Sequence, residues 1–337
     1  MASRVLLVLI VLLAAAAAHT DEAVPLFEND AVVDIELSGP LTTLIDSGST
    51  ESELPFTLRA EGVEHQIQVR LRGKSRLRVC SFPPLRLNFV ASAVEGTLFE
   101  DQDKLKLVTH CRGNERSEQD MLLEYAAYRV LNIISDVSYR VRQVRITYID
   151  TDAESVATGP KYGFLLESQD SLGDRIGIEP VELAGVSRGA LDAMQASLVF
   201  IFHYLIGNTD WSLVAADGDE HCCHNGHLFS GDSGTYLVPY DFDLSGIVNA
   251  PYAEPDPSLG IRGVTRRLYR GYCVSPEQLA AALDRIAGLQ EQILAVPASV
   301  AGLSDRRSAR AQDYLQEFFD TAENRERLLS RFENRCL

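Results

Sequence analysis

Short alternations of hydrophobic and polar positions fill the first half of the chain and predict β-strands. The runs lie at 31–37, 65–73, 84–90, 104–110 and 141–150, with a short last strand at 161–168. One helical pattern interrupts them, starting at the N-cap candidate Ser117 and continuing to Ile134 with Glu118 and Asp120 in its first turn. This half predicts a β-rich unit with a single long helix.

The second half changes to a mainly helical pattern. Helices are expected at 188–208, 275–294 and 304–335, and a β-hairpin with a Gly-Asp-Ser-Gly turn at 226–243. The first of these helices is apolar nearly all round from Leu198 to Ile206, which indicates burial. We therefore predict an α+β protein with a β-rich N-terminal lobe at 21–170 and an α-helical C-terminal lobe at 171–337.

The first 20 residues are typical of a secretory signal peptide. Arg4 precedes an apolar run from Val5 to Leu13, and an alanine run follows that offers cleavage sites. The alternative is an uncleaved anchor. Since no later apolar run approaches the roughly 20 residues needed to span a bilayer, we expect an exported protein, periplasmic or extracellular, with no membrane span after cleavage.

Composition and charge narrow the classes of partner. The chain is 46% hydrophobic and 23% charged, which suits a protein with a sizeable core, and its formal net charge is −17. Nucleic acids and anionic membrane surfaces need a basic face, so neither is expected as a partner. The charge is compatible with metal cations, and we expect a monomer.

Six cysteines in an exported chain favour disulfides over free thiols. Our predicted pairs are Cys80 with Cys111, and Cys273 with either Cys222 or Cys223. The segment His221–His227, with sequence HCCHNGH, is alternatively a zinc site, although its spacing matches no ordinary C-x2-C pattern.

Polar residues at the ends of predicted elements indicate a site for phosphoryl transfer. In VPYDFDLSG, Asp241 and Asp243 would share one face of a strand and repel each other unless a cation lies between them. Asp210 follows the buried helix in IGNTDWS, and Asn225 precedes a strand. One carboxylate can orient an attacking hydroxyl, while an Asn and a second carboxylate hold Mg²⁺ or Mn²⁺.

The segments IGNTDWS, HN and VPYDFDLSG, together with VRLRGKSRLRVCSFPPLRLNF, resemble the spore-coat H (CotH-like) atypical protein kinases over about 69–246. The resemblance implies a two-lobed protein-kinase-like fold. It implies an ATP- or other nucleotide-dependent transfer of phosphate to a hydroxyl acceptor, a protein or a small molecule. The H-R-D loop and G-x-G-x-x-G of ordinary protein kinases are absent.

By this resemblance Asp210 is the catalytic aspartate, Asn225 and Asp241 are metal ligands, and Asp243 is an accessory ligand. Lys106 is the first choice for the cation that contacts the nucleotide, paired with Glu124 on the helix. Lys74 and Arg86 are rivals for that role, and Glu167 is expected beside the adenine.

Two other functions are compatible with the sequence. A catalytically inactive kinase-like protein that binds a ligand, a cation or a partner would keep the same core. Asp46 and Asp232 lie in motifs that resemble those of pepsin-like aspartic proteases. We reject the protease because no apolar strand leads into the second motif, where Asp232 has the setting of a hairpin turn.

Overall fold

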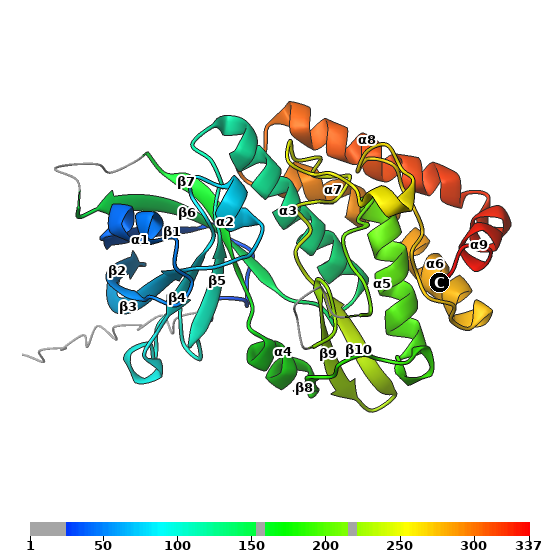
Figure 1. Cartoon of the computed structure of the whole chain (residues 1–337), viewed down its shortest axis with the longest axis horizontal. Coiled ribbons are helices and arrows are strands. Elements are labelled where there is room, and N and C mark those ends of the chain that lie inside the picture. Colours follow the sequence, from blue (N-terminus) through cyan, green and yellow to red (C-terminus); the bar gives the residue numbers. More distant parts are fainter. Residues whose placement is uncertain (1–24, 153–158, 215–220) are drawn as a thin grey trace, which may run out of the picture.

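The protein consists of a β-barrel joined through a long central helix to a mainly helical part (Figure 1). The computed structural model describes residues 25–152, 159–214 and 221–337. The predicted signal peptide lies outside the described residues. No helix among the residues described is long and apolar enough to cross a membrane.

Seven strands form the barrel, in the order β1-β2-β3-β4-β5-β7-β6. They are β1 (Val33–Gly39), β2 (Leu54–Ala60), β3 (Val63–Leu71), β4 (Leu85–Asn88), β5 (Lys104–Val108), β6 (Val141–Asp150) and β7 (Lys161–Leu166). Alternate side chains such as Leu37, Val69 and Leu87 point inward and are almost fully buried. Their period of two is the pattern that predicted these strands.

The barrel contradicts the predicted protein-kinase-like fold. Strand β1 pairs with β2 on one side and, in parallel, with β6 on the other, so the sheet closes on itself. The parallel register runs from Val33 opposite Val144 to Gly39 opposite Asp150. The expected two-lobed kinase-like architecture is therefore wrong. Periodicity predicts strands, but whether the first and sixth strands meet depends on pairing between distant segments.

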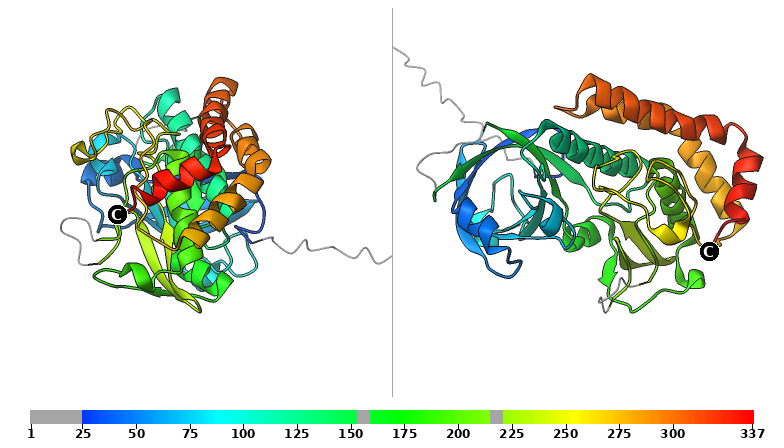
Figure 2. Two further views of the ribbon diagram at one scale, coloured as in Figure 1. Left: turned by 90° about the vertical axis from the view of Figure 1, so that its right-hand side faces the viewer. Right: turned by 45° about the horizontal axis from the view of Figure 1, so that its top comes forward.

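The C-terminal part combines a small sheet with helices. Its three-stranded sheet has the order β10-β9-β8, formed by β8 (Glu179–Val181), β9 (Gly226–Gly231) and β10 (Gly234–Pro239). The helices of the chain are α1 (Leu41–Ser47), α2 (Arg76–Val79), α3 (Glu115–Ile134), α4 (Gln169–Ile176), α5 (Ala193–Ile206), α6 (Pro276–Gly288), α7 (Gln290–Ser299), α8 (Asp305–Ala322) and α9 (Arg325–Glu333). Figure 2 shows α6 and α9 at the end of the molecule away from the barrel, while α7 and α8 run back along α3 toward it. The turn between α7 and α8 contacts the barrel, where Nε2 of Gln143 on β6 donates to the carbonyl of Ala301 at 2.6 Å.

Helix α3 connects the two parts. It begins after Asn114, whose side chain accepts a hydrogen bond from the N–H of Ser117, so the predicted N-cap at Ser117 is three residues too late. The helix contacts β6 and β7 of the barrel and also α5 and α7. Its position places Glu124 between the barrel and the hairpin of β9 and β10.

Helix α5 delivers the loop that carries Asp210. Asp192 caps its N-terminus by accepting from the N–H of Gln195, and Gly207 ends it with a left-handed φ of 67°. The side chain of Arg270 donates to the carbonyls of Thr209 and Trp211 on either side of Asp210. The chain beyond the helix is therefore held at both flanks of this residue.

Three disulfides are present, as is typical of proteins from oxidising compartments. The predicted pair Cys80–Cys111 is confirmed, but Cys273 pairs with Cys336, which leaves Cys222 bonded to Cys223. The prediction for Cys273 is wrong because the C-terminus returns to this segment. There the N–H of Cys273 donates to the carbonyl of Leu337.

Candidate functional site

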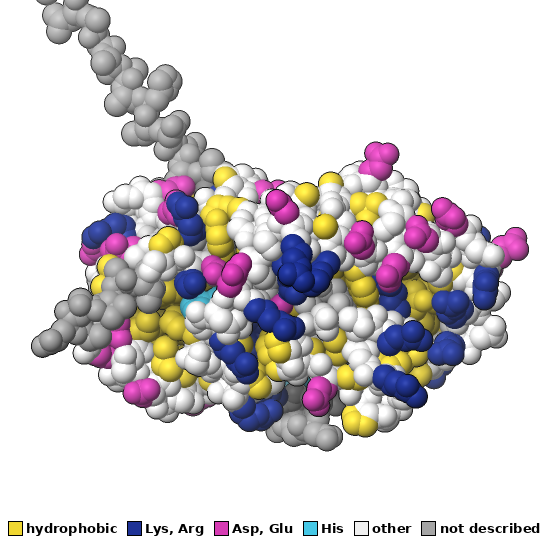
Figure 3. Space-filling model, turned by 90° about the horizontal axis from the view of Figure 1, so that it is seen from above, with side chains coloured by type: hydrophobic (Ala, Val, Ile, Leu, Met, Phe, Trp, Pro, Cys, Tyr) yellow, Lys and Arg dark blue, Asp and Glu magenta, His cyan; other side chains and the backbone are white. Residues whose placement is uncertain are grey.

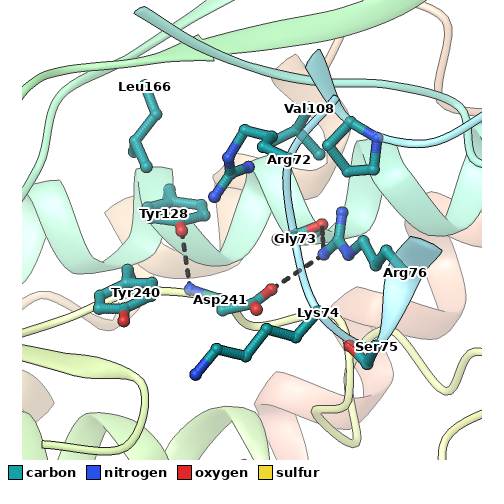
Figure 4. Close-up of a pocket in the computed structure, with 12 residues that line it drawn as sticks. Arg72, Gly73, Lys74, Ser75, Arg76, Val108, Tyr128, Leu166, Tyr240 and Asp241 are labelled. Carbon is teal, nitrogen blue, oxygen red and sulfur yellow. Dashed lines mark hydrogen bonds and ion pairs between the residues drawn. The ribbon is translucent and has the colours of Figure 1, made fainter. Parts of the chain in front are cut away.

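A small pocket lies where the barrel, α3 and the end of the β9–β10 hairpin meet. Its lining is Arg72, Gly73, Lys74, Ser75, Arg76, Pro84, Val108, Glu124, Tyr128, Leu166, Tyr240 and Asp241. Figure 4 shows Arg72 pointing toward Tyr128, and Lys74 extending past Asp241. The pocket therefore places cations from the barrel opposite a carboxylate from the C-terminal part.

Three carboxylates surround one guanidinium, and we call Glu124, Asp241 and Asp243 the carboxylate cluster. Nη2 of Arg76 donates to Glu124 at 2.7 Å and to Asp241 at 3.0 Å, while its Nε donates to Asp243 at 3.1 Å. The Arg76 side chain is only 7% exposed. The cation between Asp241 and Asp243 is thus a side chain of the protein.

The two aspartates do not lie on a strand, contrary to prediction. Strand β10 ends at Pro239, and Asp241 has a left-handed φ of 62°. Its N–H donates to the hydroxyl of Tyr128 at 2.8 Å, in place of a strand partner. Asp243 is buried and accepts from Tyr252 at 3.0 Å in addition to Arg76.

Burial and mutual repulsion shift the pKa values in this cluster. Burial raises the pKa of Glu124 to about 8 and that of Asp243 to about 6, although Arg76 opposes both shifts. Burial also opposes the charge of Arg76, but Asp243 and Glu124 together raise its pKa well above the usual value. One guanidinium facing three carboxylates favours a proton on Glu124.

The predicted metal ligands do not fit a divalent cation in this arrangement. Asp241 and Asp243 are already paired with Arg76, and Asn225 directs its amide nitrogen at Asp210. Across residues 25–152, 159–214 and 221–337, no group of three or more His, Cys, Asp or Glu side chains could hold a metal ion. Magnesium needs nearly ideal octahedral oxygen geometry, which these already engaged side chains do not offer.

Asp210 lies in a separate polar group. Its Oδ2 accepts from Nδ2 of Asn225 at 2.8 Å, and its Oδ1 lies 2.9 Å from Nε2 of His224. The side chain of Asp210 is 34% exposed, so one edge of the carboxylate is open to a substrate. A carboxylate oriented by two neighbours and open to solvent is suited to accept a proton from a hydroxyl.

The β9–β10 hairpin brings Asn225 and Asp241 to the same end. Gly226 pairs with Pro239 at the last register position, and the N–H of Tyr240 donates to the carbonyl of Asn225 at 3.1 Å. Asn225 has a left-handed φ of 54°. Asp210 is therefore connected to Asp241 through Asn225 and the backbone of Tyr240.

Arg72 and Lys106, which we call the cation pair, lie on the barrel side of the site. Neither makes an ion pair with a carboxylate in the described parts of the chain, although the charge of Asp241 acts on both and opposes the lowering of their pKa values by burial. Nζ of Lys106 lies 5.1 Å from the ring centroid of Tyr240. Burial, followed by the charge of Arg72, lowers the pKa of Lys106 to about 7.

The predicted pairing of Lys106 with Glu124 is wrong, because Glu124 is bound by Arg76. The rival Arg86 lies beside Lys106, its register partner on the neighbouring strand. Burial and then Arg70 lower the pKa of Arg86, and its Nε is buried without a hydrogen-bond partner in the described structure. Lys74, the other rival, lines the pocket itself.

Glu167 is engaged away from the pocket. Its carboxylate accepts two hydrogen bonds from Arg175, at 2.8 and 2.9 Å, and one from the N–H of Arg140 at 2.9 Å. With 3% of its surface exposed, it is a buried structural carboxylate at the end of β7.

The aspartic-protease and zinc-site alternatives receive no geometric support. Asp46 lies within α1, and Asp232 lies in the two-residue turn between Gly231 and Gly234. Cys222 and Cys223 are bonded to each other, so they offer no thiolates to zinc.

Sequence reasoning missed Arg76, Arg72 and His224 as members of the site. A signal for Arg76 was available. Basic residues recur at every second position in Arg72–Lys74–Arg76, and the two acids Asp241 and Asp243 required a cation.

Figure 3 shows Lys and Arg side chains gathered across the middle of the upper face. This grouping contrasts with the net charge of −17.

Comparison with solved structures gives a distant likeness. No family model matches the chain, and no curated protein matches it. The solved structure of the Helicobacter pylori proinflammatory kinase CtkA is similar over 80% of this chain and 88% of that chain, with a TM-score of 0.34 and 10% sequence identity. Membership of the spore-coat H family stays a prediction from the motifs.

Proposed function

We propose that this pocket binds the phosphate groups of a nucleoside triphosphate, and that the protein transfers the terminal phosphoryl group to a hydroxyl acceptor. One observation carries the proposal. Arg72 and Lys106 lie close enough for Arg72 to lower the pKa of Lys106, yet neither has a carboxylate partner in the described structure. Two adjacent, partly buried cations of this kind form a site for an anion.

Asp210 supplies the acid–base chemistry in this proposal. Its carboxylate accepts the proton of the acceptor hydroxyl as the new oxygen–phosphorus bond forms. The bond from the terminal phosphorus to its bridging oxygen breaks, and the departing nucleoside diphosphate takes the electron pair. The hydrogen bonds from Asn225 and His224 hold Asp210 in place for this step.

The cation pair stabilises the charge that develops on the transferring group. Fixed positive groups in a partly dehydrated pocket are more effective than the same groups in water. The bound phosphates would also raise the pKa of Lys106 and keep it charged. The arrangement therefore supports both binding and transfer.

Nucleotide binding and transfer of labelled phosphate test this function with two variants and a matched control. Lys106→Met should weaken ATP binding by about tenfold or more. Lys104→Met should not, because Lys104 lies on the same strand but is 52% exposed. Asp210→Asn should keep binding and lose transfer. Equal binding by Lys106→Met and the wild type would contradict the proposed site.

The second candidate function is binding without transfer. The pairing of the carboxylate cluster with Arg76 favours it, because these acids are already neutralised within the protein. In the same experiment this candidate predicts ATP binding that depends on Lys106, with no labelled product from the wild type.

A further inference from the structure

We propose that Arg76 is the resident counter-ion of this site and replaces a divalent cation, so that phosphate groups bind in the pocket without metal. The part of this proposal that concerns phosphate binding rests on the proposed function. The exclusion of a metal by Arg76 does not, since it depends only on contacts within the protein. The two parts are therefore tested separately.

Arg76 occupies the space between the acids that were predicted to hold a metal. Its guanidinium reaches carboxylates on helix α3 and on the chain after β10, at 2.7 to 3.1 Å. These residues include two of the three predicted metal ligands, Asp241 and Asp243. A cation placed between them would have to displace a guanidinium that is 7% exposed and paired with three acids.

One nitrogen of the Arg76 guanidinium is not used by the carboxylates. Nε and Nη2 make all of its hydrogen bonds to carboxylates, whereas Nη1 makes none with a described residue. Arg76 also lines the pocket together with Arg72 and Lys74. Nη1 can therefore donate to a ligand oxygen while the other two nitrogens hold the carboxylates.

The short helix α2, which carries Arg76, is held in place by neighbouring parts of the chain. This helix has only four residues, Arg76–Val79, and is too short to be stable alone. The disulfide Cys80–Cys111 ties its end to the chain after β5, and Nε of Arg112 donates to the carbonyl of Val79 at 2.9 Å. Arg76 is consequently held in place before any ligand binds.

Manganese binding to the protein without nucleotide tests the exclusion of metal, by electron paramagnetic resonance. The wild type should bind no Mn²⁺ in this cluster, and Arg76→Met should gain one bound ion. That ion should be lost again in Arg76→Met combined with Asp243→Asn. Arg78→Met is the matched control, an exposed arginine on the same helix that should behave as the wild type. A wild-type Mn²⁺ site abolished by Asp241→Asn, or a folded Arg76→Met variant that gains no ion, would overturn the proposal.

Binding of inorganic tripolyphosphate to the wild type gives a second test that needs no variant to fold. Its affinity should be the same, within about twofold, in EDTA and in excess Mn²⁺. Binding that is about tenfold or more tighter with Mn²⁺ would show that Arg76 does not replace the metal. Absence of tripolyphosphate binding under both conditions would refute the proposed function, while the manganese experiment would still decide whether Arg76 excludes a metal.

Discussion

The carboxylate cluster and the cation pair meet at one pocket, which Glu124 and Asp241 line from the first and Arg72 from the second, but only the cluster is paired with an opposite charge within the protein. Glu124, Asp241 and Asp243 share Arg76. Arg72 and Lys106 have no carboxylate at ion-pairing distance among the residues that the structure describes. A buried charge that lacks a partner is unfavourable. The carboxylate cluster therefore stabilises the folded protein, whereas the cation pair would be stabilised by an anionic ligand.

This difference predicts opposite consequences when charges are removed. Removing the cation from the carboxylate cluster leaves the buried Glu124 and Asp243 without their counter-ion and destabilises the fold. Removing a cation from the pair relieves repulsion and costs only ligand binding.

Arg76→Met should lower the free energy of unfolding by about 3–5 kcal/mol, because it leaves buried carboxylates without their partner. Arg78→Met, on the exposed side of the same helix, should change it by less than about 0.5 kcal/mol. Chemical denaturation measures both. Equal values for the two variants would mean that the cluster is not held together by Arg76.

Replacing Cys80 and Cys111 with serine should lower the free energy of unfolding by about 2–4 kcal/mol. It should also weaken tripolyphosphate binding, because α2 and Arg76 lose their tether. Replacing Cys273 and Cys336 removes a disulfide far along the chain from α2. That variant should lose stability while keeping its affinity for tripolyphosphate, which calorimetry can compare.

Glu124→Gln should change how stability depends on pH. The pKa of Glu124 is raised from 4.5 to about 8, so the folded protein binds this proton more tightly than the unfolded chain does. The stabilisation that comes from this proton is therefore fully present below pH 4.5 and is lost as the pH rises toward 8. Relative to the glutamine variant, wild-type stability should fall by at most about 1.4 kcal/mol per pH unit in this window.

Thermal unfolding of both proteins across this range measures the difference. Subtracting the variant's curve removes the contributions of the other titrating groups, such as the buried histidines. A difference that stays constant from pH 4.5 to 8 would contradict the shifted pKa of Glu124.

Lys106→Met should raise the free energy of unfolding by about 1 kcal/mol while it weakens ATP binding. The pKa of Lys106 is lowered from 10.5 to about 7, so wild-type stability rises as the pH increases through this window. The difference in free energy of unfolding between Lys106→Met and the wild type should be largest below pH 7 and should disappear toward pH 10.5. A destabilised Lys106→Met would show that Lys106 has a structural role.

Sequence patterns predicted most of the elements and several site residues, for local reasons. The strands from β3 to β7 and the helices α3, α5 and α6 follow hydrophobic periodicity within a single segment. Strand β2 and helix α4 were missed, and the predicted C-terminal helix is divided into α8 and α9. The structure brings Asn225 into contact with Asp210, and the hairpin returns the chain to Asn225 just before Asp241, while the shared role of the three residues stays a prediction.

The sequence by itself determined which segments form strands and helices, because alternation and helical spacing are read within one segment. It also showed that Asp241 and Asp243 need a cation. Only the tertiary structure decided that β6 closes the barrel on β1 and that Arg76, 165 residues away from Asp241, provides the cation. The physical reason is the same in both cases. Pairings between distant segments depend on the packing of the whole chain, whereas periodicity and composition report only local preferences.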